Sequence, residues 1–491
     1  MKAKTIGELK KSGYTSKSIK DELRDNLIDH IKNNKPVFTG IFGYENTVIP
    51  DLQRAILSKH HINLLGLRGQ AKTRLARQMV ELLDEYIPVV EGSELNDDPL
   101  NPISTYAKNK IAEMGDATPV EWLHRNDRYA EKLATPDVSV ADLIGDVDPI
   151  KAANLRLSYA DERVIHYGII PRSNRCIFVI NELPDLQARI QVALFNILQE
   201  GDIQIRGFKV RVPLDIEFIF TANPEDYTNR GSIVTPLKDR IGSQILTHYP
   251  KTADLSMKIT KQEAKLSKEQ LSAVTIPDLL VRVIEQVAIE ARVSEFVDAK
   301  SGVSARLTIS AYENLASAIE LRMFAAGEPK ATGRIADLAG ILPAINGKIE
   351  LVYEGEQEGA AMVAKNLIDK AIRNLFIEYF PDPSKLKKQK EDSAYKTITE
   401  WFAANNGVEL LDEDSENDYR KKLSAVPGLV QLVEDHVENM AKDELYVWME
   451  FVLHALAEHS QIGKTEIETG SKFSDLFGAL FTTKKKGWDE D

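Results

Sequence analysis

The chain has 491 residues, 43% of them hydrophobic and 28% charged, which is enough for several domains with buried cores. Its formal net charge of −13 argues against a basic nucleic-acid-binding face, and no apolar run approaches the ~18 residues of a membrane-spanning helix. The first residues contain no apolar signal core, and a single cysteine, Cys176, cannot form an internal disulfide, so a cytoplasmic location is the default expectation.

Changes in hydrophobic periodicity divide the chain into parts. Short apolar runs that alternate with amphipathic helices indicate a mostly parallel sheet covered by helices, whereas helical periodicity alone indicates all-α structure. The expected parts are a charged helical segment at 1–36, an α/β core at 37–250 with an insertion at about 91–133, a helical lid domain at 251–380, a charged linker at 381–393 and a helical C-terminal module at 394–491.

Two of these parts carry more specific expectations. The insertion begins with the loop-like sequence EGSELNDDPLNP and is predicted to be helical up to about Leu133. In the C-terminal module, WFAANNGVELL and LYVWMEFVLHAL read as amphipathic helices, and we expect Trp401 and Trp448 to pack in a core.

Three continuous apolar runs predict strands that are buried on both faces, as the strands of a parallel sheet are. They are INLL at 62–65, CIFVI at 176–180 and EFIFTA at 217–222. Between the second and third runs, DIQIRGFKVRV alternates in the manner of a hairpin, with Gly207 at its turn.

The first predicted strand runs into GLRGQAKT, which is one residue away from the phosphate-binding pattern G-x-x-x-x-G-K-[ST]. Gly66 and Gly69 permit a tight backbone whose N–H groups converge on phosphate oxygens. Lys72 would reach the phosphates, and the hydroxyl of Thr73 would help to hold Mg²⁺. Ala71 occupies the place of the last glycine.

The effect of Ala71 depends on its backbone conformation. With a negative φ, alanine is tolerated and favours the helix, whereas with a positive φ it is penalised. The loop by itself is therefore compatible with a nucleotide site and with a fortuitous strand–loop–helix junction.

The second predicted strand ends in Asn181 and Glu182, where many nucleotide hydrolases have an Asp-Glu pair. The first acid of such a pair supports the magnesium shell and the second activates water. Asn181 carries no charge but retains hydrogen-bonding capacity, and Glu182 is the candidate general base. The alternative role for Glu182 is to cap the helix that follows.

Three polar residues at the end of the third predicted strand and beyond it each have a possible functional role and a possible structural role. Asn223 is placed either to orient an attacking water or to begin an Asn-Pro turn. Arg240, in TPLKDRIG, is an arginine finger for a neighbouring subunit, an internal salt bridge or an exposed charge. Arg306, in GVSARLTIS, begins an amphipathic helix, for which a surface role is the default.

Taken in order, these segments resemble the AAA+ ATPases, in the clade of the magnesium chelatase ATPase subunit and the MoxR-type ATPases. The series is GLRGQAKT, LATPDVSVADLIGDVDP, YGIIPRSNRCIFVINELPDL, a hairpin, FIFTANPED, LKDRIG and SARLT. The resemblance covers roughly residues 37–330 and implies an AAA+ α/β domain followed by a helical lid. In this clade, Ala71 matches a variant form of the loop.

The resemblance implies ATP and Mg²⁺ as cofactors and assigns the residues that bind them. Adenine is cradled by Ile41, Phe42 and Gly43, and the phosphates are bound by Gly66, Gly69, Gln70, Ala71, Lys72, Thr73 and Arg74. Thr73 and Asn181 occupy the positions of the metal shell, where the family usually has aspartate in place of Asn181.

The same resemblance implies the catalytic roles. Glu182 matches the catalytic acid and Asn223 the sensor of the third strand. Arg240 matches the arginine finger that acts across a subunit boundary, and Arg306 matches the sensor arginine of the lid. The departure at Asn181 implies slower hydrolysis or a weaker magnesium site, with nucleotide binding retained.

The function implied by the resemblance is an ATP-driven homo-oligomeric ring, expected to have six subunits, that remodels a partner protein. In this clade the partner is often a protein with a von Willebrand A domain. Two alternatives remain: the ATPase subunit of a magnesium chelatase that inserts Mg²⁺ into a porphyrin, and a nucleotide-gated scaffold that barely hydrolyses ATP because of Asn181. A nucleic-acid partner is not expected.

Overall fold

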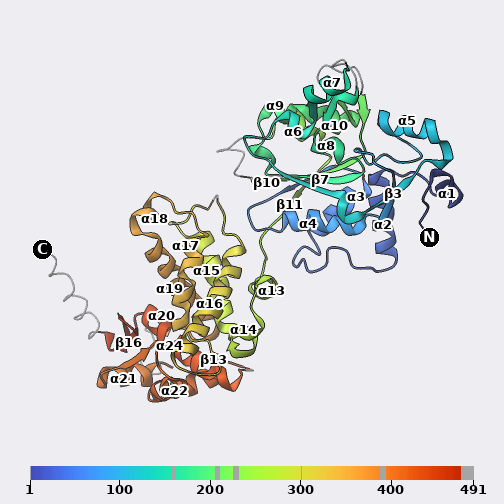
Figure 1. The fold of residues 1–491 in the computed structure, drawn as a ribbon. Helices are drawn as coiled ribbons and strands as arrows, with labels where there is room; N and C mark the ends of the chain where they lie inside the picture. The colour runs from blue at the N-terminus through green and yellow to red at the C-terminus, as the bar shows by residue number, and fades with distance from the viewer. Residues whose placement is uncertain are drawn as a thin grey trace. The chain divides into compact units, whose positions relative to one another are not determined.

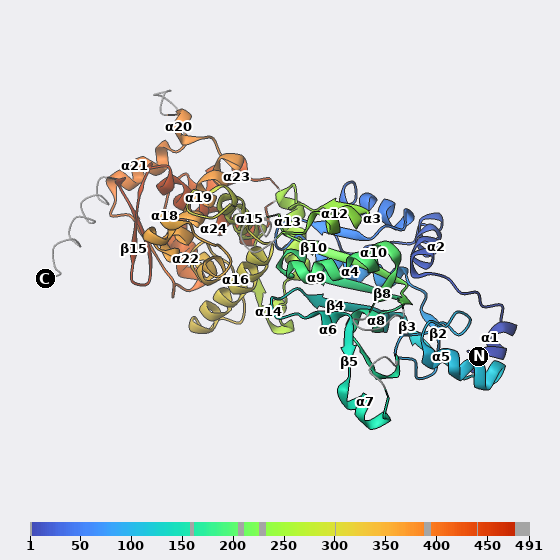
Figure 2. The same ribbon diagram turned by 90° about the horizontal axis from the view of Figure 1, so that it is seen from above.

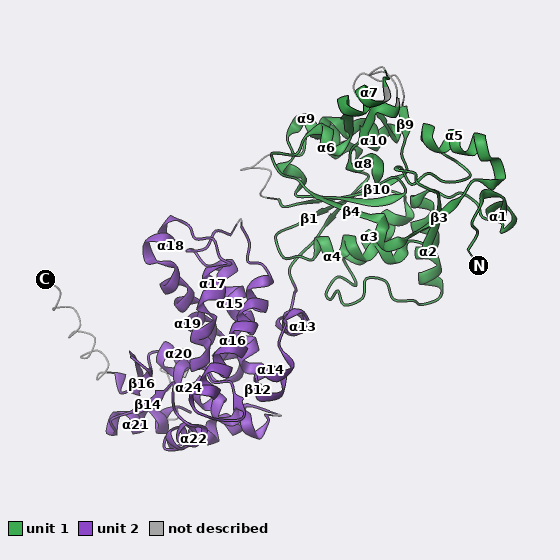
Figure 3. Ribbon diagram, viewed as in Figure 1, with its two compact units in different colours: residues 1–249 green, residues 250–491 purple. Residues whose placement is uncertain are grey.

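The structure is a computed structural model that describes residues 2–157, 162–204, 211–224, 232–299, 301–386, 394–438 and 440–476. It divides into two compact units, residues 1–249 and 250–491, which are coloured separately in Figure 3. Each unit has its own hydrophobic interior. None of the helices in the described ranges combines the length and apolar character required to cross a bilayer.

The first unit is built on a five-stranded sheet in which all neighbouring strands are parallel. All three strands predicted from apolar runs are present in it. In spatial order, the strands are β11 (Ser243–Leu246), β1 (Ile62–Leu65), β10 (Ile216–Ala222), β7 (Cys176–Asn181) and β4 (Tyr129–Leu133). The parallel α/β core expected from the sequence is therefore confirmed.

Helices cover both faces of this sheet, and alternate residues of the strands fill two separate cores (Figure 1). Ile177 and Val179 of β7 face one core, whereas Phe178 and Ile180 face the other. The first core is covered by α2 (Ile19–Lys32), α3 (Val48–Leu57) and α4 (Lys72–Gln78). The second is covered by α6 (Val140–Leu143), α8 (Ile169–Arg172), α9 (Ala188–Ala193), α10 (Phe195–Glu200) and α12 (Thr235–Arg240).

The insertion expected at 91–133 is not helical throughout. It contains one α-helix, α5 (Thr105–Met114), followed by the strands β3 (Val120–His124) and β4. β3 pairs with β2 (Tyr86–Val90), and β4 forms an edge of the main sheet. The sequence YAEKL of β4 lacks a continuous apolar run because an edge strand is only partly buried, which is why the strand signal was missed.

Smaller elements complete the first unit. The strands β5 (Gly145–Val147) and β6 (Ile165–Tyr167) pair, and together with α7 (Pro149–Leu155) they project from the sheet (Figure 2). The predicted hairpin is present as β8 (Asp202–Gln204) and β9 (Arg211–Pro213), but its turn at Gly207 lies outside the described residues. The N-terminal segment begins with α1 (Ile6–Lys11).

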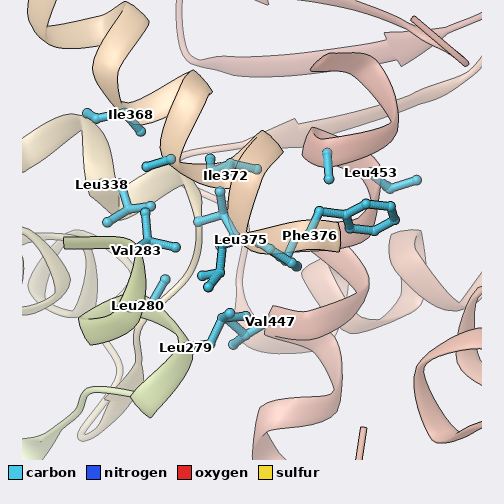
Figure 4. Packing of buried hydrophobic residues seen from close by; sticks show 14 of the residues in the cluster. Leu279, Leu280, Val283, Leu338, Ile368, Ile372, Leu375, Phe376, Val447 and Leu453 are labelled. Atoms are coloured by element: carbon cyan, nitrogen blue, oxygen red, sulfur yellow. The ribbon is translucent and has the colours of Figure 1, made fainter. Parts of the chain in front are cut away.

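The second unit is helical around one large core. Apolar side chains of α15 (Asp278–Val293), α19 (Ala360–Tyr379) and α24 (Leu445–Glu458) meet there, including Leu280, Phe376 and Leu453 (Figure 4). Each such buried side chain contributes roughly 1.5–3 kcal/mol. The other helices are α13 (Ala253–Glu263), α14 (Lys268–Ala273), α16 (Arg306–Ala325), α17 (Leu342–Asn346), α18 (Tyr353–Glu358), α20 (Pro383–Leu386), α21 (Lys396–Ala404), α22 (Glu416–Ser424) and α23 (Leu429–His436).

Two features of this unit differ from the expectation of separate lid and C-terminal modules. The same core contains residues from both stretches, so they form one body. Strands are also present: β12 (Val274–Thr275) pairs with β13 (Ala331–Thr332), and a sheet is formed by β14 (Val408–Leu411), β16 (Gly470–Ser474) and β15 (Gly463–Ile467). Part of the expected linker, 387–393, lies outside the described residues.

The prediction of one helix over WFAANNGVELL is wrong in its second half, which forms the strand β14. α21 ends at Ala404, and the chain turns through Gly407, whose φ is 87°. A side chain at Gly407 would collide with the carbonyl of Phe473 on β16, so only glycine permits this approach of the two backbones. VELL then alternates buried and exposed as a strand. Trp448, on the correctly predicted last helix, is buried in the core.

A buried ion pair joins the N-terminal helix α2 to the sheet. The guanidinium of Arg128, fully buried just before β4, donates to both carboxylate oxygens of Glu22 at 2.6 and 2.7 Å. Its Nε donates to the carbonyl of Arg175, and the N–H of Asp84 donates to the Glu22 carboxylate. The two charges are thus compensated inside the unit.

Replacing Arg128 with methionine should leave the Glu22 carboxylate buried without its cation. We expect the free energy of unfolding to fall by about 3–5 kcal/mol, measured by urea denaturation. The exposed Arg54 is the matched control, because its loss should cost under about 1 kcal/mol. The double variant Glu22→Leu/Arg128→Met should recover most of the loss, and equal effects at Arg128 and Arg54 would contradict this description.

Candidate functional site

The predicted phosphate loop lies between β1 and α4, at the carboxyl end of the parallel sheet. The N–H of Gly66 donates to the carbonyl of Ala222 at the end of β10, at 3.1 Å. A Cβ on Gly66 would collide with Thr247 Oγ1 and with Gln70 Oε1, so a larger residue would displace both side chains. Gly69 has a φ of 75°, which glycine adopts without strain.

Lys72, the first residue of α4, folds over the loop and reaches the next strand. Its ammonium donates to the carbonyls of Gly66 and Leu67, the latter at 2.9 Å. It also donates to Asn223 Oδ1, at 2.9 Å. The structure therefore brings the lysine of the loop and the predicted sensor of the third strand into direct contact. A phosphate group that approached Lys72 would have to replace at least one of these acceptors.

Ala71 adopts the conformation that the sequence could not decide. Its φ of 56° and ψ of 18° lie in the left-handed region, where an alanine costs about 1–2 kcal/mol. The loop is held in place beside this residue: Gln70 is buried, and its Oε1 accepts a hydrogen bond from Thr247 Oγ1 at 2.6 Å. The conformation persists because tertiary contacts fix it.

The segment expected to contact adenine runs close to the loop. Ile41 is buried in the core beneath α4, Phe42 follows it, and Gly43 has a φ of 83°. The hydroxyl of Tyr44 lies 3.0 Å from the carbonyl of Gln70 and 2.8 Å from that of His248. Burial raises the pKa of Tyr44 to about 12, so this hydroxyl remains a hydrogen-bond donor at neutral pH.

At the end of β7, Asn181 is 91% buried and takes part in a chain of hydrogen bonds across three strands. Thr221 on β10 donates to Asn181 Oδ1 at 3.1 Å, and Asn181 Nδ2 donates to the carboxylate of Glu131 on β4. The N–H of Glu182 donates to Thr221 Oγ1, and Glu182 has a φ of 57°. Its side chain forms no cap on the 3₁₀ helix that follows, Leu183–Asp185. The capping alternative for Glu182 is therefore not observed.

The two predicted arginines belong to different units of the structure. Arg240, at the end of α12, donates to Gln199 Oε1 at 2.9 Å and to the carbonyl of Pro236 at 2.7 Å. Its guanidinium carbon also lies 4.9 Å from the centre of the Phe195 ring. Arg306 is the first residue of α16 in the second unit. Thr73 and Arg74 occupy the first turn of α4 and are partly buried.

Three residues near the loop were missed by sequence reasoning. Tyr44 and Thr247 follow no motif, and their proximity to the loop depends on the packing of distant segments. Glu131 was missed because its strand was read as helical. YAEKL neither alternates apolar and polar residues nor forms an apolar run, so no periodic signal placed it on a strand beside β7.

Residues 107–241 match the model of the AAA domain of the dynein-related subfamily. The chain contains an AAA domain. This match supports the AAA part of the family expectation over residues 107–241, and the finer clade stays a prediction. The matched residues of this AAA domain include Asn181, Glu182, Asn223 and Arg240, and the match begins after the phosphate loop.

The chain is similar to several solved structures. One is a chain of the complex between the BchI and BchD subunits of magnesium chelatase, which is 18% identical. The match covers 66% of this chain and 99% of that chain, with a TM-score of 0.33. An ATPase candidate from Cytophaga hutchinsonii is 18% identical, covers 74% and 98%, and has a TM-score of 0.29. A Thermotoga maritima RuvB mutant is 12% identical, covers 93% and 99%, and has a TM-score of 0.34. A comparison with curated proteins gives no match.

Replacing Ala71 with glycine should relieve the left-handed strain in the loop. We expect the free energy of unfolding to rise by up to about 1 kcal/mol, measured by thermal denaturation. The matched control is Ala112→Gly in the exposed part of α5, which should lower it by about 1 kcal/mol. Equal destabilisation by both substitutions would show that Ala71 has a negative φ in solution.

Proposed function

We propose that this AAA protein binds and hydrolyses ATP as a homo-oligomeric ring and uses the energy to remodel a partner protein. The observation that carries the proposal is the hydrogen bond between Lys72 Nζ and Asn223 Oδ1. It joins the residue suited to bind phosphate to the residue suited to orient water, although 151 positions separate them in the sequence. A fortuitous strand–loop–helix junction would not need this pairing.

The backbone of the loop fits a bound triphosphate. Gly66 and Gly69 remove side chains from the turn, and the first backbone N–H groups of α4 lie at the end of the loop, beside the Lys72 side chain. Ile41, Phe42 and Gly43 lie in the segment that Tyr44 ties to Gln70, which suits the proposed adenine site. Gln70, Ala71, Thr73 and Arg74 complete the proposed phosphate site.

The oxygen donors nearby fit Mg²⁺, which prefers hard oxygen ligands and retains several waters. Thr73 offers a hydroxyl, and Asn181 offers an amide that is already ordered by Thr221. When bound, Mg²⁺ would neutralise charge on the phosphates. Glu182, held at the end of β7 through its N–H, is the proposed general base, and Asn223 is proposed to hold the attacking water in line.

Arg240 supports a shared site between subunits. Within its own chain its guanidinium contacts Gln199, Pro236 and Phe195, none of which belongs to the phosphate loop. These contacts leave it partly exposed at the end of α12. An arginine so placed is suited to stabilise transition-state charge at the site of a neighbouring subunit. Arg306 is proposed as the sensor arginine of the lid.

A second candidate, a nucleotide-gated scaffold with weak hydrolysis, is favoured by Asn181. The position usually filled by an aspartate carries no charge here, and its amide is engaged with Thr221 and Glu131. The two functions share ATP binding and differ in turnover. A von Willebrand A domain partner and a part in porphyrin metalation remain proposals that follow from the clade. A cytoplasmic location is proposed from the single cysteine, Cys176.

The Lys72→Ala variant should lose ATP binding, because the cation that reaches the phosphates is removed. We expect affinity for a fluorescent ATP analogue to fall by at least about 100-fold, measured by titration in the presence of Mg²⁺. Lys32→Ala, an exposed lysine of α2, is the control and should bind as the wild type does. Unchanged binding by Lys72→Ala would contradict the assignment of the loop.

Mixing two inactive variants tests the shared site. Arg240→Ala and Lys72→Ala should each lack ATPase turnover, whereas a mixture of the two proteins should regain part of it. About a quarter of the subunit interfaces in a random ring would combine an intact Lys72 with an intact Arg240. Phosphate release is the measurement. Full activity of Arg240→Ala alone would contradict a role for this arginine, and turnover near zero in the wild type would favour the scaffold.

A further inference from the structure

We propose that Glu131, on the edge strand β4, supplies the negative charge of the magnesium shell that Asn181 lacks. This inference rests on the proposed ATP-binding function and names a further residue of that site. Asn181 occupies the position where a carboxylate is expected, and the carboxylate of Glu131 accepts a hydrogen bond from its Nδ2. The negative charge expected at the end of β7 is thus carried by a side chain of the neighbouring strand, β4.

Strand register places the two side chains on the same face of the sheet. Glu131 is the register partner of Val179, and Leu133 that of Asn181. Val179 packs in the core beneath α4. Asn181 lies two positions further along the same strand, and Glu131 lies opposite Val179 on the neighbouring strand, so both side chains also face α4. This is the helix that follows the phosphate loop.

The spacing of α4 brings Thr73 to the same level. Arg77 of α4 donates to the Glu131 carboxylate at 2.9 Å, so this turn of the helix lies within side-chain reach of Glu131. Thr73 precedes Arg77 by one helical turn, ~5.4 Å towards the loop, and two strand positions rise by a similar ~6.6 Å. From these two offsets we infer that Thr73 lies near the level of Asn181, on the face of the sheet that also carries Glu131.

The hydrogen bonds also explain why residue 181 is an amide. Thr221 Oγ1 donates to Asn181 Oδ1 and itself accepts from the N–H of Glu182, so the amide oxygen of Asn181 faces β10. Its Nδ2 then faces Glu131, a carboxylate that can only accept. An aspartate at 181 would place two negative charges in contact. Asparagine and glutamate together give one charge at this edge, as aspartate and glutamine would.

Glu131 is ordered enough to act on water around a cation. Its side chain is 23% exposed, and it accepts from Tyr129 at 3.1 Å as well as from Arg77 and Asn181. Carboxylates in the outer shell of a metal orient its water ligands, and their loss lowers metal affinity by about 10–100-fold. The alternative role is to tie α4 to the sheet through Arg77. The Arg77 side chain is 64% exposed, so that ion pair contributes little.

A charge exchange between the two strands tests the proposal. The variants are Glu131→Gln, Asn181→Asp and the double variant Glu131→Gln/Asn181→Asp, with Glu81→Gln as an exposed control. The measurements are the affinity for a fluorescent ATP analogue as a function of Mg²⁺ concentration, and Mn²⁺ binding to the nucleotide complex by electron paramagnetic resonance. Neither readout requires turnover.

We expect Glu131→Gln to raise the Mg²⁺ concentration for half-maximal binding about 10-fold and to weaken Mn²⁺ binding equally. The double variant should restore both, because it returns one carboxylate to the site. Arg77→Gln should have a smaller effect than Glu131→Gln. An unchanged metal dependence of Glu131→Gln, or no recovery in the double variant, would overturn the role of Glu131 and leave ATP binding standing. Absence of nucleotide binding by the wild type would overturn both proposals.

Discussion

The parallel alignment of β1, β10 and β7 is the constraint on which the candidate site depends. Parallel strands end at one edge of a sheet, so the residues that follow each strand are neighbours there, however far apart they lie in the sequence. Gly66 follows β1, Asn223 follows β10, and Asn181 ends β7. The hydrogen bonds from Gly66 to Ala222 and from Thr221 to Asn181 hold these ends in register.

Tertiary contacts also maintain a loop conformation that its own sequence does not favour. Ala71 has a left-handed backbone where the standard pattern has glycine, and the neighbouring Gln70 is fixed by Thr247 and Tyr44. Local strain of this kind is common at functional sites, where the surrounding structure over-determines the backbone. The contacts that offset this backbone strain come from Tyr44 and Thr247, which are far apart in the sequence and approach one another only in the folded unit.

The second unit is organised differently, around one core that joins segments expected to be separate. Helical periodicity correctly indicated helical structure before residue 380 and the helix α24, but it gave no information on which helices share an interior. Phe376 of α19 and Leu453 of α24 lie in the same cluster, so the stretches before and after the charged segment fold together. The small sheet of β14, β15 and β16 closes that body.

The buried strands, and the order of the polar residues that follow each of them, can be predicted from the amino-acid sequence because these features are local and periodic. The same holds for the loop between β1 and α4. The sequence did not determine β4, since an edge strand has no continuous apolar run, nor β14, where Gly407 redirects the chain. It also left open the φ of Ala71 and the contact between Asn181 and Glu131. Backbone conformation in a constrained loop and hydrogen bonds between strands 50 residues apart depend on the packing of the whole unit, so they are fixed only when the chain is folded.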